Sequence, residues 1–353
     1  MDMTYEGEFA QHELGKALLQ ALRAGNTDEA KRLVEAGAPI NWMEMNKIAE
    51  TALMIAARWA DEDTVRWLLD HGADARAMTL TGATVVMYAI ASGRIDVVRL
   101  IMDNGARVDY RVDAGDDSPL MWAASRGDLD IVKFVLDHGG SVETRNKDNE
   151  TALHFAAKGG NIEIVRLMLD LGLVVDADNP SGETVLHRAA MSGNVDVVQL
   201  CLDRGADPNA PTESGVTVLH RAAMSGNVDV VQLCLDRGAD PNAPTERGVT
   251  VLQLVAKRGF ADVAQVLLDH GADVNATTRY GGTPLSYAIG ARQPEIVRLL
   301  LARGADMVPE SDIDETARQN RSFDQFKAMK AIVSDCERIQ RWHRRRILVI
   351  WAH

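Results

Sequence analysis

The sequence contains only three cysteines, Cys201, Cys234 and Cys336, among 353 residues. Cysteines this few and this widely spaced exclude a disulfide-stabilised scaffold and a cysteine-rich zinc site. No apolar run approaches the roughly 20 residues that a helix needs to cross a bilayer. The first ten residues, MDMTYEGEFA, lack the basic start and apolar stretch of a secretory signal. We therefore expect a soluble intracellular protein, cytoplasmic or nuclear.

The sequence also lacks an excess of basic residues and the common catalytic motifs. It has 38 Lys and Arg against 51 Asp and Glu, a formal net charge of −13. This charge argues against a generic nucleic-acid or membrane surface. No HExxH, GxSxG, P-loop or GxGxxG pattern occurs in a supporting context. We predict that the chain is not an enzyme, has no cofactor or metal site and takes no small-molecule substrate.

What the sequence does contain is a repeat of 33 residues, with one step of 34. The repeats begin at Thr51, Thr84, Ser118, Thr151, Thr184, Thr217, Thr250 and Thr283, and an earlier one begins at about Lys16. Counted from that first residue, position 3 is apolar in all nine repeats, position 6 is Ala in eight and position 22 is Gly in all nine. A period of this length indicates a solenoid.

Each repeat has the pattern of a helix, a tight turn, a second helix and a loop. Thr at position 1 is a good N-cap, and Pro119 and Pro284 at position 2 suit a first helical turn. Gly at positions 10 and 22 falls where helices end with a positive φ. Positions 14, 15, 17, 18 and 19 are mostly Val, Ile or Leu. One repeat cannot bury such a broad apolar face alone, so neighbouring repeats must stack.

These repeats resemble the ankyrin repeat family, whose Thr-Pro-Leu-His motif occurs here in variants. The variants are TALH at 151–154, TVLH at 184–187 and 217–220, SPLM at 118–121 and TPLS at 283–286. The family's Gly-Ala-Asp ending occurs as GADPN and GADVN, and the resemblance covers about 300 of 353 residues. It implies an all-α solenoid of antiparallel helix pairs with hairpin-like loops. It also implies a scaffold or adaptor that binds another protein.

The repeat register divides the chain into four segments. We expect an N-terminal extension over 1–12, nine repeats over 13–308, a degenerate capping repeat over 309–335 and a basic, apolar tail over 336–353. Within the array, residues 184–213 and 217–246 are identical at all 30 positions. Recent duplication, gene conversion and deliberate construction would each produce this identity.

Several polar residue types recur at fixed positions of the repeat. Position 13 is acidic in all nine repeats and position 20 in eight, so the negative charge is spread along the scaffold. An acid at position 13 lies in the first turn of the second helix, where the helix dipole favours it. His154, His187 and His220 share position 4, too far apart to hold one metal ion. We expect them to join loop and helix by hydrogen bonds. Cys201 and Cys234 share position 18 and should be buried.

The resemblance places the contact surface on the first helix and the loop tips, at positions 5, 8 and 9. These 27 positions contain no Asp or Glu. The predicted partner-binding residues among them are Arg58, Trp59, Tyr88, Trp122, Arg126, Lys158, Arg188, Arg221, Lys257 and Arg258. One interpretation is a basic, aromatic-lined groove for an acidic segment with an apolar anchor. The other is that the cations at positions 8 and 9 neutralise helix C-termini and that the aromatic rings at position 5 are partly core. The two interpretations do not exclude each other.

Two other segments carry candidate contacts. In the enlarged first loop, Trp42 and Met43 either contact a partner or pack over the N-terminal repeat. The stretch 338–353 has five arginines and no acid. Its predicted contact residues are Arg341, Trp342, Arg344, Arg345 and Arg346. This stretch either docks on the array, forms a helix that binds a partner or a membrane surface, or serves as a localisation signal.

Three functional hypotheses follow. The first is a non-enzymatic scaffold that binds a protein partner. The second is a tether whose tail engages an anionic membrane or nucleic acid. The third is a subunit of an enzyme whose catalytic partner is another chain.

Overall fold

In the computed structural model of the protein, residues 2–44, 48–108 and 117–306 are described, with side chains from residue 9 onwards. These residues form eighteen helices and no named strand, which confirms the all-α class. The chain divides into an N-terminal block, residues 1–179, and a C-terminal block, residues 180–353. The capping repeat expected at 309–335 and the tail expected at 336–353, with its five predicted contact residues, lie outside the described residues.

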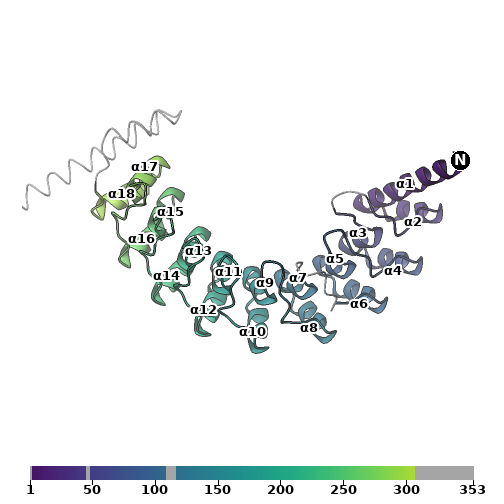
Figure 1. Ribbon diagram of the computed structural model, residues 1–353, viewed down its shortest axis with the longest axis horizontal. Helices are drawn as coiled ribbons and strands as arrows, with labels where there is room; N and C mark the ends of the chain where they lie inside the picture. The colour runs from purple at the N-terminus through teal and green to yellow at the C-terminus, as the bar shows by residue number, and fades with distance from the viewer. Residues whose placement is uncertain (1, 45–47, 109–116, 307–353) are drawn as a thin grey trace, which may run out of the picture. The chain divides into compact units, whose positions relative to one another are not determined.

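The N-terminal block consists of five helix pairs (Figure 1). Its helices are α1 (Asp2–Arg23), α2 (Thr27–Glu35), α3 (Ala52–Trp59), α4 (Glu62–Asp70), α5 (Val85–Ser92), α6 (Ile95–Asp103), α7 (Pro119–Arg126), α8 (Leu129–Asp137), α9 (Ala152–Gly159) and α10 (Ile162–Asp170). First helices pack on the first helices of neighbouring repeats, and second helices pack on second helices. The segment 1–12, expected as an extension, continues into the first repeat as the N-terminal half of α1.

The C-terminal block consists of four helix pairs arranged in the same way (Figure 1). Its helices are α11 (Val185–Ser192), α12 (Val195–Asp203), α13 (Val218–Ser225), α14 (Val228–Asp236), α15 (Val251–Arg258), α16 (Ala261–Asp269), α17 (Pro284–Gly290) and α18 (Pro294–Ala302). The two identical stretches form α11 with α12 and α13 with α14, and the helices have the same lengths in both.

The first helices begin where the sequence predicts. The hydroxyl of Thr51 accepts a hydrogen bond from the backbone N–H of Met54 at 3.3 Å, which satisfies a donor that the first helical turn leaves unpaired. Pro119 and Pro284 occupy the first turns of α7 and α17, where a missing N–H costs nothing. Thr or Ser occupies the N-cap position of every first helix from α3 to α17, as predicted, and the side-chain cap bond is made at Thr51, Ser118 and Thr283.

The helix ends depend on glycine in the left-handed region. Gly93 ends α5 with φ 75°, and Gly72, which follows α4, has φ 90°. A side chain is strained at such angles, whereas glycine adopts them freely. The strict recurrence of glycine at position 22 follows from this backbone requirement.

The core lies between the two helices of each repeat and between neighbouring repeats. Leu53, Leu120 and Leu186 at position 3 have at most 1% of their surface exposed. Cys201 and Cys234 are fully buried, as predicted, and burial raises the pKa of the Cys234 thiol to about 12. A thiol with this pKa is held as the neutral form and packs as a small apolar side chain.

The loops are joined by backbone hydrogen bonds between neighbouring tips. In the C-terminal block the N–H of Glu246 donates to the carbonyl of Ser214 at 2.9 Å, and the N–H of Arg279 donates to the carbonyl of Arg247 at 3.2 Å. In the N-terminal block the N–H of Leu80 donates to the carbonyl of Ile48 at 3.1 Å. These bonds link successive tips in the C-terminal block and the first two tips in the N-terminal block.

Candidate partner-binding site

The predicted contact residues occupy two places on the first helices. Tyr88, Trp122, Arg188 and Arg221 at position 5 lie near the middle of α5, α7, α11 and α13. The others, Arg58, Trp59, Arg126, Lys158, Lys257 and Arg258, lie in or next to the last turns of α3, α7, α9 and α15. The two sets differ in burial and in their intramolecular partners.

Tyr88 belongs to the core. Only 6% of its surface is exposed, and burial together with the nearby Glu50 carboxylate raises the pKa of its phenol. Its ring is therefore not available as a contact for a partner, in agreement with the interpretation that aromatic residues at position 5 are core residues. Trp122 and Phe155, at the same position in later repeats, are half-buried.

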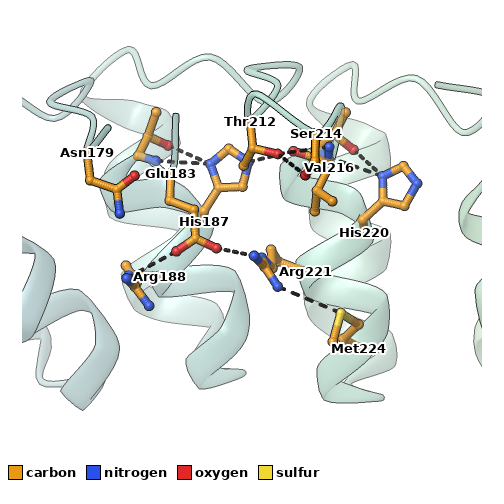
Figure 2. Close-up of polar contacts among 12 residues, drawn as sticks. Asn179, Glu183, His187, Arg188, Thr212, Ser214, Val216, His220, Arg221 and Met224 are labelled. Carbon is orange, nitrogen blue, oxygen red and sulfur yellow. Dashed lines mark hydrogen bonds and ion pairs between the residues drawn. The ribbon is translucent and has the colours of Figure 1, made fainter. Parts of the chain in front are cut away.

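Arg188 and Arg221 share one carboxylate, that of Glu183 (Figure 2). Arg188 Nη2 lies 3.1 Å from Glu183 Oε2, and Arg221 Nη2 binds Glu183 Oε1. The Glu183 side chain is 8% exposed, whereas those of the two arginines are 21% and 24% exposed. The three groups carry a net charge of +1, and the arginines present that charge at the surface because they cover the carboxylate.

Arg126 is bound to the neighbouring repeat. Its guanidinium donates to the carbonyls of Ala91 at 2.7 Å and Ser92 at 3.2 Å, at the C-terminal end of α5. A Cβ at Gly93 would overlap this guanidinium, so glycine at that position makes room for the contact. A cation at a helix C-terminus is stabilised by the unpaired carbonyls and the helix dipole. This is the second of the two predicted roles for such a residue.

The remaining cations are exposed at the surface. Arg58 lies over the ring of Trp59, with 4.9 Å between its guanidinium carbon and the ring centroid, and Trp59 is 70% exposed. Lys158, Lys257 and Arg258 are exposed and have no ion-pair partner in the part of the chain that the structure describes. Arg58, Trp59 and Lys158 are thus open to a partner on the N-terminal block, and Lys257 and Arg258 on the C-terminal block.

Acidic residues immediately before the first helix are functional neighbours that positions 5, 8 and 9 did not reveal. Glu50, Asp117, Glu150 and Glu183 all occupy the position before the opening Thr or Ser. Glu50 accepts a bond from Arg23 at 3.0 Å, and Glu183 binds arginines of its own and the next repeat. The sequence signal was available, since four of the nine repeats carry an acid at this one position.

The position-4 histidines make the predicted structural hydrogen bonds (Figure 2). The N–H of Thr184 donates to His187 Nδ1 at 3.2 Å, and His187 Nε2 bonds the carbonyl of Val216 at 3.2 Å. His220 repeats the arrangement with Val249, and His154 repeats it with Ala177. Each histidine therefore fixes a first helix to a loop.

Trp42 packs over the first repeat. Its ring meets that of His12 edge to face at a centroid distance of 5.1 Å, and a Cβ at Gly15 would overlap it. The packing interpretation therefore accounts for Trp42, whereas the adjacent Met43 is 41% exposed. Within the described ranges, no three His, Cys, Asp or Glu side chains gather as a metal site needs, and no helix has the length and apolarity to cross a membrane.

A family model described as ankyrin repeats (3 copies) matches the chain in overlapping windows that together run from residue 18 to residue 311. The chain belongs to the ankyrin repeat family. The helix pairs, the Thr N-caps and the terminal glycines described above are thus the features of its ankyrin repeats. The resemblance stated from the motifs is confirmed.

Proteins from three organisms match shorter parts of the chain. The Notch protein of Drosophila melanogaster is 39% identical over 74 residues, 21% of this chain and 3% of Notch. A putative ankyrin repeat-containing protein of Treponema pallidum is 34% identical over 86 residues, 24% of this chain and 28% of that protein. A putative ankyrin repeat protein of Acanthamoeba polyphaga mimivirus is 27% identical over 111 residues, 29% of this chain and 68% of that protein. The chain thus matches only a small part of Notch and of the Treponema protein.

Proposed function

We propose that this ankyrin repeat protein is a non-enzymatic scaffold that binds a segment of another protein on its first helices and loop tips. Ankyrin repeats are in general protein-interaction modules. The observation that carries the proposal is the exposed set Arg58, Trp59, Lys158, Lys257 and Arg258. In the described chain these residues contact no carboxylate, although the protein as a whole has a net charge of −13.

The partner segment carries carboxylates and an apolar anchor. Exposed Lys and Arg at the ends of first helices attract acidic groups and accelerate association. Trp59, which presents most of its ring to solvent beside Arg58, offers the kind of large amphipathic surface that dominates binding energy at protein interfaces. We place this function inside the cell.

Charge reversal tests the proposal. The variant Lys158→Glu, Lys257→Glu, Arg258→Glu is compared with Lys133→Glu, Arg166→Glu, Arg298→Glu, whose exposed cations lie on second helices. Both variants lower the formal net charge by six. Proteins captured by the parent and identified by mass spectrometry should be lost from the first variant and retained by the second. Equal capture by all three proteins at low salt would contradict the proposal.

The alternative function is a tether that engages a membrane surface or nucleic acid through the tail. It rests on the arginine-rich sequence at 338–353. A truncation before residue 338 separates the two functions. The scaffold predicts that protein capture survives the truncation, whereas the tether predicts loss of binding to anionic vesicles or nucleic acid. Retained vesicle and nucleic-acid binding would eliminate the tether.

A further inference from the structure

Two cavities in the N-terminal block have Trp122 in their lining. One has a volume of about 340 Å³ and is lined by Ala91, Asp117, Trp122, Ser125, Arg126 and Phe155. The other, of about 320 Å³, has Lys147 and Asp148 among its lining residues. Asp117 and Trp122 line both cavities. A carboxylate and an indole ring are thus the shared wall of a site large enough for a side chain of a bound segment.

The repeat register explains why a carboxylate lies here. Asp117 precedes the N-cap Ser118, as Glu183 precedes the N-cap Thr184. Glu183 lies between the position-5 residues of its own and the next repeat, which are Arg188 and Arg221. Asp117 shares its cavity with the position-5 residues of its own and the next repeat, which are Trp122 and Phe155. Residues of the same repeat positions therefore lie beside both acids.

The two places differ in what neutralises the acid. At Glu183 the chain itself supplies two guanidinium groups. At Asp117 it supplies only the side-chain amide of Asn146, whose Nδ2 donates at 2.7 Å, and two aromatic rings beside an open cavity. Within the described residues Asp117 has no cationic partner. A guanidinium from another protein could donate hydrogen bonds to this carboxylate and stack on the aromatic rings beside it.

The two cations that line the cavities do not occupy this place. Arg126 is held by the carbonyls of Ala91 and Ser92, so its hydrogen-bond donors point to the end of α5 rather than to Asp117. Lys147 is exposed and, with Asp148, lines the other cavity and not the one that Phe155 lines. The carboxylate of Asp117 consequently retains acceptor capacity toward the cavity that Phe155 lines.

We infer that an arginine side chain of the bound protein segment occupies the cavity between Trp122 and Phe155, with its guanidinium on Asp117. Arginine fits better than lysine because its planar group stacks on an aromatic ring while it donates two parallel hydrogen bonds to a carboxylate. This inference rests on the proposed scaffold function and adds one basic residue to a partner segment that is otherwise acidic. It would make the partner a segment of mixed charge.

The experiment uses the full chain and a small probe, N-acetyl-arginine amide. The indole N–H resonance of Trp122 is assigned by its disappearance in Trp122→Phe and followed by NMR as the probe is added. A saturable shift is expected with the arginine probe and a much smaller one with N-acetyl-glutamine amide. Asp117→Asn should weaken binding of the arginine probe about tenfold, because it removes a charged hydrogen-bond acceptor.

Asp130→Asn is the matched control, since it makes the same chemical change at an exposed position of α8. It should leave binding of the probe unchanged. The inference is overturned if the arginine probe causes no saturable shift, or if Asp117→Asn and Asp130→Asn bind it equally well. The probe needs no partner protein, so binding of arginine together with failed partner capture would remove the scaffold proposal alone. If the probe does not bind but the charge-reversal variant loses partner capture, only this inference is removed.

Discussion

His187 and His220 are buried imidazoles whose two ring nitrogens are both occupied. Nδ1 accepts from the N–H of the opening Thr, so the proton lies on Nε2, which donates to a loop carbonyl. Protonation of Nδ1 would place its N–H directly opposite the backbone N–H of the opening Thr, and the two donors would repel each other. Burial, more than any other cause, lowers the pKa of both imidazoles below the ordinary value of 6.5. The fold therefore selects the neutral ring.

This selection predicts acid sensitivity. Below about pH 6.5 the unfolded chain binds more protons at these sites than the folded chain. The contribution of these histidines to the free energy of unfolding should therefore be complete above pH 6.5. It should decrease as the pH falls toward the lowered pKa values. His187→Gln with His220→Gln should reduce this decrease. Denaturant titrations of parent and double variant at pH 7.5 and 5.0 measure the loss of unfolding free energy between the two pH values.

Another repeat of the same chain supplies the reason for choosing glutamine. Gln253 accepts from the N–H of Thr250 at 2.8 Å and donates to the carbonyls of Ala276 and Gly282 at 2.8 and 2.9 Å. The double variant should therefore stay within about 1 kcal/mol of the parent at pH 7.5. His138→Gln, at an exposed position, is the control for the exchange of histidine for glutamine itself. Identical pH dependence in parent and double variant would contradict the prediction.

At the scale of the helix, the end of α5 depends on a contact from the next repeat. Gly93 holds φ 75°, and the guanidinium of Arg126 lies where its Cβ would be. Gly127 ends α7 with φ 81°, but a Cβ there would meet Asn161 only at an ordinary 3.6 Å. The two glycines thus share the backbone requirement and differ in the side chain that approaches them.

Alanine at these glycines should separate the two effects. Gly127→Ala should cost about 1–2 kcal/mol of unfolding free energy, the strain of a side chain in the left-handed region. Gly93→Ala should cost more, because it also displaces Arg126 from the carbonyls of α5. In an Arg126→Ala background, Gly93→Ala should cost only as much as Gly127→Ala, as a double-mutant cycle by denaturant unfolding would show. Additive costs would mean that the guanidinium does not matter at Gly93.

The helices could be predicted from the sequence because their determinants are local and repeated. An N-cap, an apolar face and a terminal glycine each recur every 33 residues. An atypical residue in one repeat therefore does not hide the pattern that the nine repeats share. The shared carboxylate of Glu183 could not be predicted in this way. It depends on the distance in space between Glu183 and position 5 of the next repeat. The sequence period alone does not determine that distance. The cavities beside Trp122 likewise depend on packing between repeats.

At the scale of the whole molecule, stability is a sum over repeats and the contacts between neighbours. The two identical stretches allow this to be tested with the same contacts between repeats, except that Glu183 loses one of its two arginines. Deletion of residues 184–216 joins Glu183 directly to Thr217 and removes one repeat of 33 residues. The remaining repeat keeps its N-cap, its terminal glycines and one arginine at position 5 for Glu183.

This deletion should leave a folded protein with a lower unfolding free energy. The denaturant dependence of that free energy should fall by about a tenth, in proportion to the surface removed. Deletion of residues 184–193 removes fewer residues but leaves α12 without its partner α11, so its apolar face is exposed. It should therefore cause the larger loss of stability, measured by circular dichroism during denaturation. A larger loss from the 33-residue deletion would mean that the number of residues, rather than the register of the repeats, determines the stability of this solenoid.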